Sequence, residues 1–295
     1  MTVEPMISFI KSIEMKDNNM RRSKIIEQLE LMGCDYLIQT YPFTHSAMEG
    51  NNIIVNLGDS DQKIVVGAHY DVAEGGGGAN DNGSGVSVLL KFIQDFKEFD
   101  KLSSSIDVVF FDHEETPESG ARYYVENSDK ARINGMFNLD ICGMGNIIVF
   151  DDKGKPGSPI VESVVEAIES LRYSYSVLRE LPASDERQFE EAGVPNIQLA
   201  VIPEEDIGLV KKLVVAQKEL RSAIQRGDIS PREADVLIKE MLGGADLPKL
   251  LRVMHTPDDS ATHLSEQTLL MVLKVLCEAV SILDEKMVNH LSINP

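Results

Sequence analysis

The sequence predicts a three-layer α/β/α protein, in which helices cover both faces of a central, mixed and mostly parallel sheet. Short apolar runs alternate with longer stretches of helical periodicity, and this alternation is typical of such sheets. Some runs are apolar throughout, as expected for strands that are buried on both faces. Between residues 203 and 252 only helical patterns occur, which predicts a helical insertion within one domain spanning residues 1–295.

The first third of the chain begins with helices and continues with strands. Residues 4–33 have helical spacing, with an interruption near Asp17 and a stop around Gly33. A helix is also expected after the glycine-rich stretch, over residues 83–99, because apolar residues recur there on one side. The predicted strands between these helices cover residues 36–40, 53–57 and 64–68.

The middle of the chain repeats the order of strand and helix. Buried strands are expected over residues 106–111 and 136–141, and both are followed by acidic residues. Residues 147–150 are expected to be a hairpin-like neighbour of the second of these strands. Helices are predicted over residues 121–126, 158–171 and 186–192, and strands over 174–178 and 197–202.

The C-terminal part of the chain is predicted to be helical. Within the insertion, Ser230, Pro231 and Glu233 indicate a helix start with a capping box. Its apolar stripe consists of Ala234, Leu237, Ile238, Met241 and Leu242. Such a stripe usually serves core packing, while a substrate-gating lid or a dimer contact remain alternatives. Ser265 is expected to cap a long amphipathic helix that runs from residue 266 to about 288.

Composition and charge narrow the classes of partner. The chain has 48 acidic and 28 basic residues and a net charge of -20, which repels nucleic acid and anionic membranes. It has neither a bilayer-length apolar run nor a signal-peptide pattern, so a soluble, cytoplasmic protein is expected. The cysteines Cys34, Cys142 and Cys277 lack metal-type spacing and are interpreted as buried, inert thiols.

Side chains that can ligate metals fall at the predicted strand ends and in the adjoining loops. They are His69, Asp71, Asp81, Glu114, Glu115, Asp140 and His255. Five carboxylates in one crevice cannot all stay ionised without a counter-charge, because like charges raise one another's pKa. Imidazoles with carboxylates suit zinc, with manganese or cobalt as alternatives. A bridging carboxylate would allow two metal ions with an open position for water, which is a hydrolytic arrangement.

Sequence spacing separates the roles of neighbouring side chains. His69 and Asp71 are two residues apart on one face of a strand, so Asp71 can accept the second ring proton of His69. Adjacent acids in an extended segment point in opposite directions. Of Glu114 and Glu115, one is therefore expected to ligate metal and the other to act on water.

Other conspicuous residues receive simpler interpretations. The four glycines at residues 75–78 lack the lysine of a phosphate-binding loop, so we expect them to let the backbone approach the metal centre. His113 adjoins the acidic pair without an assigned role. His45, His263 and His290 lack acidic company and are interpreted as surface or structural residues.

Together these motifs resemble the M28 family of zinc-dependent exopeptidases, relatives of bacterial leucyl-type aminopeptidases. In the family's order they are G-A-H-Y-D at 67–71, A-N-D-N-G-S-G at 79–85, F-D-H-E-E at 111–115, N-L-D at 138–140, S-D at 184–185 with G-V-P at 193–195, and H-T-P-D-D at 255–259. The resemblance extends from about residue 20 to 290 and implies the zinc-exopeptidase fold.

The resemblance also implies a role for each ligand-type residue. Asp81 would bridge two metal ions, with His69 and Asp140 completing one site. Glu115 and His255 would complete the other site, and Glu114 would be the general base. A cis peptide bond between Asp81 and Asn82 is a further implied feature.

The resemblance predicts an aminopeptidase that acts on peptides, but the chain departs from the family in one place. Many relatives carry a tyrosine before the last ligand histidine, where this chain has Met254, so an oxyanion donor must come from elsewhere or be missing. Asp185 and Glu186 could attract a substrate's α-ammonium group or could simply cap a helix. No residue is assigned to substrate binding.

Several other functions remain open at this point. A glutaminyl-cyclase-like acyl transferase shares the fold but typically uses one zinc ion. A carboxypeptidase, a specialised dipeptidase and a non-catalytic relative are further alternatives. Homo-oligomerisation through the insertion is also open.

Overall fold

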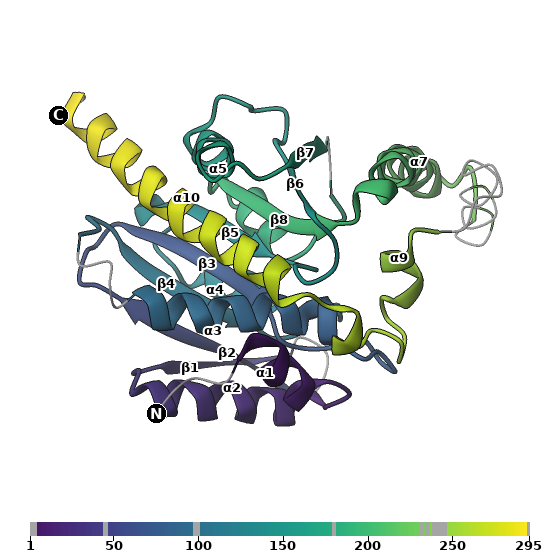
Figure 1. Ribbon diagram of the computed structural model, residues 1–295, viewed down its shortest axis with the longest axis horizontal. Coiled ribbons are helices and arrows are strands. Elements are labelled where there is room, and N and C mark those ends of the chain that lie inside the picture. The colour runs from purple at the N-terminus through teal and green to yellow at the C-terminus, as the bar shows by residue number, and fades with distance from the viewer. Residues whose placement is uncertain are drawn as a thin grey trace.

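The computed structural model describes residues 5–43, 47–96, 101–178, 181–230, 233, 237 and 247–293. Within these residues an eight-stranded sheet lies between two layers of helices (Figure 1). The predicted three-layer α/β/α fold is confirmed. In the sheet, the strand order is β1-β2-β4-β3-β5-β8-β6-β7.

The centre of the sheet is parallel, and its flanks contain antiparallel pairs. Strand β3 pairs in parallel with β4 and β5, and β5 pairs in parallel with β8. Antiparallel pairing joins β1 to β2, β2 to β4 and β6 to β8, whereas β7 lies parallel to β6. The strand bounds are β1 Leu37–Pro42, β2 Glu49–Leu57, β3 Lys63–His69, β4 Ser105–Phe111, β5 Ile133–Leu139, β6 Ile147–Asp151, β7 Tyr175–Leu178 and β8 Asn196–Ile202.

One predicted pairing is wrong. Residues 147–150 belong to β6, which does not pair with β5 as expected, because β8 lies between the two strands. All seven residues of β8 are buried, so this strand is most stable in the interior of the sheet, where both of its faces are covered. Strands β5 and β6 are close in sequence, which favoured a hairpin, but the buried strand β8 pairs with both of them instead.

Two helical layers bury the two faces of the sheet. One layer contains α1 (Met6–Ile13), α2 (Asn18–Met32), α3 (Gly85–Phe96), α5 (Pro159–Ser170) and α10 (Glu266–Ile293), whose apolar residues form the larger core cluster with the strands. The other contains α4 (Gly120–Glu126) and α6 (Glu186–Glu191), which contribute Tyr124 and Phe189 to a smaller cluster. Shorter helical turns are η1 (Ala79–Ser84), η2 (Lys130–Arg132), η3 (Glu204–Asp206) and η4 (Ala261–His263).

Several predicted helix ends appear in the structure. The residue that ends α2, Gly33, has a left-handed backbone, a conformation that glycine adopts without a steric penalty. Ser265 accepts a hydrogen bond from the Thr268 N–H as the expected cap of α10. The expected helix over residues 83–99 is divided between η1 and α3, and residues 97–99 lie outside the described part.

The segment predicted to be a helical insertion is only partly among the described residues. It contains α7 (Ile207–Arg226) and α9 (Lys249–Val253), which Figure 1 shows to the right of the strands. Val210, Leu250 and Val253 pack in a third apolar cluster with residues of β6 and β8. The expected capping box is present, because Ser230 N–H donates to Glu233 Oε2 at 2.8 Å and Glu233 N–H donates to Ser230 Oγ at 3.3 Å. Most of the predicted stripe, Ala234, Ile238, Met241 and Leu242, lies outside the described residues.

The cysteines only partly match the expectation of buried thiols. Cys142 is buried, whereas Cys34 and Cys277 are partly exposed. Among the described helices, none combines the length and the apolar character that crossing a bilayer requires.

Candidate metal centre

The carboxyl ends of three parallel strands carry the predicted ligands to one edge of the sheet. His69 is the last residue of β3, Glu114 and Glu115 follow β4, and Asp140 follows β5. Parallel neighbours end at the same edge, so these residues meet although they are distant in sequence. Asp81 in η1 and His255 after α9 complete the group.

The group divides into two halves that share Asp81. Nε2 of His69 lies 3.2 Å from Asp81 Oδ1 and 3.7 Å from Asp140 Oδ1. On the other side, Nε2 of His255 lies 3.2 Å from both Asp81 Oδ2 and Glu115 Oε1. Asp81 therefore presents one carboxylate oxygen to each half, as a bridging ligand would.

Four buried polar atoms at this centre lack a hydrogen-bond partner among the described residues. Within the described residues, both ring nitrogens of His69, Oε1 of Glu115 and Oδ1 of Asp140 have no hydrogen-bond partner. Buried polar atoms in native proteins are almost always hydrogen-bonded, and an exception is explained by strain, by a catalytic role, or by binding of water or an ion. The atoms form sets of nitrogen and oxygen donors within 4.8 Å of one another, and such donors fit zinc.

In the metal-free site, the raised pKa values of His69 and His255 favour their protonated forms, whose positive charge offsets the negative charge of the carboxylates. Burial alone would lower the pKa of His69, but the carboxylates of Asp140, Asp71 and Asp81 raise it well above its usual value. Asp81 and Glu115 raise the pKa of His255 to about 10. Burial would raise the pKa of Asp81, yet the two histidines lower it. Because a ligating histidine is neutral, metal binding must displace these protons.

Asp71 connects two of the segments that carry ligands. Its Oδ1 lies 3.3 Å from Nδ1 of His69. This is close to the predicted contact, but the two atoms do not form a hydrogen bond. The same carboxylate accepts the N–H groups of Glu114 and Glu115, each at 3.0 Å. These backbone contacts were not predicted, and they tie the end of β3 to the segment after β4.

Glu114 lies beside the two halves without joining either bridged set. One of its carboxylate oxygens is close to candidate ligand atoms of His69 and Glu115. Burial, with smaller contributions from Asp140 and Glu115, raises the pKa of Glu114 to about 8. A carboxylate with a raised pKa next to a metal position can accept a proton and later release it.

The loop that carries Asp81 is held by residues to which the sequence assigned no role. Asp259 is buried, and its two oxygens accept the N–H groups of Asn80 at 2.8 Å and Asp81 at 3.0 Å. The side-chain amide of Asn82 donates to the carbonyl of Leu139 at 2.7 Å. Asp259 belongs to the H-T-P-D-D motif, and this motif was the only feature of the sequence that pointed to a role for Asp259. The implied cis peptide bond between Asp81 and Asn82 is confirmed.

Asp185 and Glu186 have different surroundings. Asp185 is buried, and neither of its oxygens has a hydrogen-bond partner in the described part of the chain. Burial raises its pKa well above the usual value, and His69 and Glu114 are the charges that act on it most strongly. Glu186 instead accepts hydrogen bonds from Asn138 and Ser184. Asp185 therefore remains a candidate for contact with substrate, while Glu186 is engaged in hydrogen bonds within the protein.

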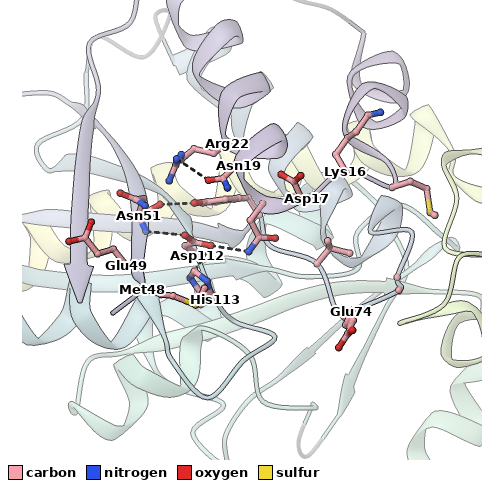
Figure 2. A pocket seen from close by; sticks show the side chains of 17 residues that line it. Lys16, Asp17, Asn19, Arg22, Met48, Glu49, Asn51, Glu74, Asp112 and His113 are labelled. Carbon is pink, nitrogen blue, oxygen red and sulfur yellow. Dashed lines mark hydrogen bonds and ion pairs between the residues drawn. The ribbon is translucent and has the colours of Figure 1, made fainter. Parts of the chain in front are cut away.

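The remaining histidines stay outside the ligand group. Nδ1 of His113 lies 3.1 Å from Asp112 Oδ1, and its ring packs edge-on against Phe43. His113 lines a separate cavity of about 520 Å³ between the turn that joins α1 to α2, the start of β2 and the glycine loop (Figure 2). His263 lies in η4. His45 and the side chain of His290 are outside the described residues.

The glycines at residues 75–78 were predicted to let the backbone approach the metal centre, and Gly77 shows such a close approach. A Cβ atom at this position would lie 2.0 Å from the carbonyl oxygen of Asp259, which no side chain could tolerate. The N–H of Gly77 donates to the carbonyl of Thr256 at 2.8 Å. The glycine thus allows the backbone to approach the segment that begins with His255.

The chain is similar in sequence to known enzymes. Leupeptin-inactivating enzyme 1 of Streptomyces exfoliatus is 29% identical over 181 residues, which are 57% of this chain and 39% of that protein. Aminopeptidase YwaD of Bacillus subtilis strain 168 is 29% identical over 138 residues, 44% of this chain and 30% of that protein. The chain thus matches less than half of the length of each of these relatives.

Solved structures share the fold. A zinc aminopeptidase from Bacillus subtilis has a TM-score of 0.60 and 23% identity, covering 80% of this chain and 50% of its own. A glutaminyl cyclase from Porphyromonas gingivalis has a TM-score of 0.66 and 18% identity, covering 96% of this chain and 95% of its own. At these sequence identities the structural similarity shows only that the fold is shared.

The family assignment rests on a longer match. The profile of Peptidase family M28 matches residues 52–280, a range that contains every predicted metal ligand. The chain therefore belongs to peptidase family M28.

Proposed function

We propose that this chain is a metal-dependent aminopeptidase that removes N-terminal residues from peptides at a dinuclear zinc centre. The observation that carries the proposal is the position of Asp81, whose two oxygens face different histidines, each at 3.2 Å. His69 and Asp140 would hold one metal ion with Asp81, and Glu115 and His255 would hold the other. Bound zinc supplies Lewis acidity that activates water and polarises a carbonyl group.

Glu114 is the general base in this proposal. It takes a proton from the attacking water and passes it to the nitrogen of the leaving amine. Its pKa of about 8, raised chiefly by burial, supports a carboxyl group that can hold the proton between these steps. Asp71 keeps Glu114 in place through the backbone N–H rather than through the side chain, so the carboxylate stays free to act.

The buried carboxyl group of Asp185 favours the amino end of a peptide over the carboxyl end. Neither of its oxygens has a hydrogen-bond partner among the described residues. These oxygens can accept hydrogen bonds from a substrate's α-ammonium group, whereas a terminal carboxylate has no proton to donate. This supports aminopeptidase over carboxypeptidase activity, with Asp185 as a candidate contact for the ammonium group.

The test is hydrolysis by the purified chain supplied with zinc. We expect release of the N-terminal residue from aminoacyl amides and short peptides, and no hydrolysis of peptides whose amino end is blocked. Failure to cleave any aminoacyl substrate would end the proposal.

Metal counting and a second substrate distinguish the glutaminyl-cyclase alternative. Elemental analysis should find two zinc ions per chain. One ion, together with formation of pyroglutamate from a glutaminyl peptide, would instead identify an acyl transferase on the same fold.

A further inference from the structure

A fully buried arginine lies next to the loops that carry the metal ligands. Arg21, in α2, has no exposed surface. Its Nε donates to the carbonyl of Tyr70, and its Nη1 donates to the carbonyls of Ile13 at 3.2 Å and Gly78 at 3.0 Å. A buried guanidinium is costly unless its donors are engaged. These contacts engage Nε and Nη1 and determine where the side chain lies, whereas Nη2 has no hydrogen-bond partner among the described residues.

Two of the three carbonyls border residues of the metal centre. Tyr70 stands between His69 and Asp71, and Gly78 directly precedes η1, which contains Asp81. One rigid guanidinium therefore holds the end of β3 and the beginning of η1 at a defined separation. Arginine suits this task because its donors form a planar fork.

The backbone at Gly78 is adapted to this contact. Its φ is +68°, and a Cβ atom there would lie 2.7 Å from Nη1 of Arg21. A side chain at this position would displace the guanidinium. Gly78 and Arg21 therefore form a matched pair.

The segment that joins α1 to α2 adds further bonds to the same loops. The N–H of Met15 donates to the carbonyl of Gly77 at 2.9 Å. Oε2 of Glu14 accepts the N–H of Ala261 at 3.1 Å, next to the segment that carries His255 and Asp259. The segment between α1 and α2 thus contacts both the glycine loop, which precedes Asp81, and the segment that follows His255.

The charge of Arg21 also matters for the acidic centre. Burial lowers its pKa to about 10, while the carboxylates of Asp71, Asp81 and Asp259 act to raise it. The guanidinium is therefore charged at neutral pH. A fixed cation close to these carboxylates reduces the repulsion between them.

We propose that Arg21 is a positioning residue of the metal centre, which sets the separation of its two ligand segments through the carbonyls of Tyr70 and Gly78. The match to the family begins at residue 52, so Arg21 lies outside it. The inference rests on the proposed function, because it requires that the centre binds metal. Loss of the fork loosens the spacing of His69 and Asp81 and weakens metal binding.

The test measures zinc binding in the full chain by competition with a chromophoric chelator. Arg21→Met is expected to lower the affinity about 10- to 100-fold, the usual effect of losing a residue that orients metal ligands. Arg21→Lys keeps the charge but not the fork, and an intermediate affinity is expected. The matched control is Arg22→Met, because Arg22 is partly exposed and its Nη2 donates to Asn19. The control should bind zinc like the wild type.

Thermal unfolding with and without zinc separates positioning from general stabilisation. A positioning role predicts that Arg21→Met has a smaller zinc-induced rise in Tm than the wild type. If Tm falls equally with and without zinc while the affinity is unchanged, the inference is overturned. Should Arg21→Met fail to fold, Arg21→Lys decides, because wild-type affinity in that variant shows that the fork is not needed.

The outcomes also distinguish this inference from the proposed function. A wild-type chain that binds no zinc overturns both. A wild-type chain that binds zinc while both Arg21 variants bind it equally well overturns only the role of Arg21.

Discussion

Replacing Glu114 with glutamine should stop turnover without disturbing the metal centre. The substitution keeps the size of the side chain and removes its ability to accept a proton. The hydrogen bond from the Glu114 N–H to Asp71 belongs to the backbone and is retained. Neither set of ligand atoms that shares Asp81 includes Glu114, so metal content should stay the same.

The expected loss can be given a magnitude. A positioned general base contributes about 10²- to 10⁴-fold to a rate, which corresponds to about 2.7 to 5.4 kcal/mol in the activation barrier. Because the ligands are untouched, the loss should appear in kcat rather than in zinc affinity. If Glu114 is the base, the acidic limb of the pH–rate profile should disappear with it.

The assay is steady-state hydrolysis of an aminoacyl amide, with elemental analysis and thermal unfolding of the same samples. Glu115→Gln is the matched control, because Oε1 of Glu115 lies 3.2 Å from His255 and its loss should reduce zinc binding. Unchanged kcat in Glu114→Gln would refute the assigned role. Loss of zinc from Glu114→Gln would show that Glu114 is a ligand instead.

Three further predictions concern the same centre. The apparent zinc affinity should rise with pH up to about 10, by about tenfold per pH unit for the proton on His255. The raised pKa of His255 keeps the metal-free imidazole protonated, whereas ligation requires the neutral form. Competition titrations at several pH values measure this dependence, and an affinity that does not change with pH would contradict it. Asp259→Ala leaves two buried N–H groups without an acceptor and should lower the free energy of unfolding by about 2 to 6 kcal/mol in urea titrations. The control Asp258→Ala, at the exposed neighbouring position, should have little effect. Equal losses in both variants would refute the role of Asp259 in holding the Asp81 loop. Removal of metal by a chelator should abolish hydrolysis and lower Tm, and added zinc should restore both; full activity after verified removal would exclude a metal mechanism.

Much of the fold and the ligand group could be predicted because the signals are local. The capping box of Ser230 and Glu233 and the left-handed end of α2 at Gly33 depend on residues a few positions apart. The strands are recognisable as short apolar runs, and polar residues at their ends meet once the strands are parallel. The sequence by itself therefore determined the element types, the α/β class and which side chains gather at one edge.

The tertiary structure decided features that depend on distant segments. The place of β8 between β5 and β6 follows from burial of both faces of that strand, which no local pattern reveals. Arg21 and Gly78 are 57 positions apart, and Asp259 and Asn80 are 179 positions apart. Arg21 reads as an ordinary helical residue, and only the folded chain surrounds it with carbonyls and carboxylates. The candidate ligands were visible in the sequence. The residues that support them were not, because their side chains bond to distant backbone groups only when the chain is folded.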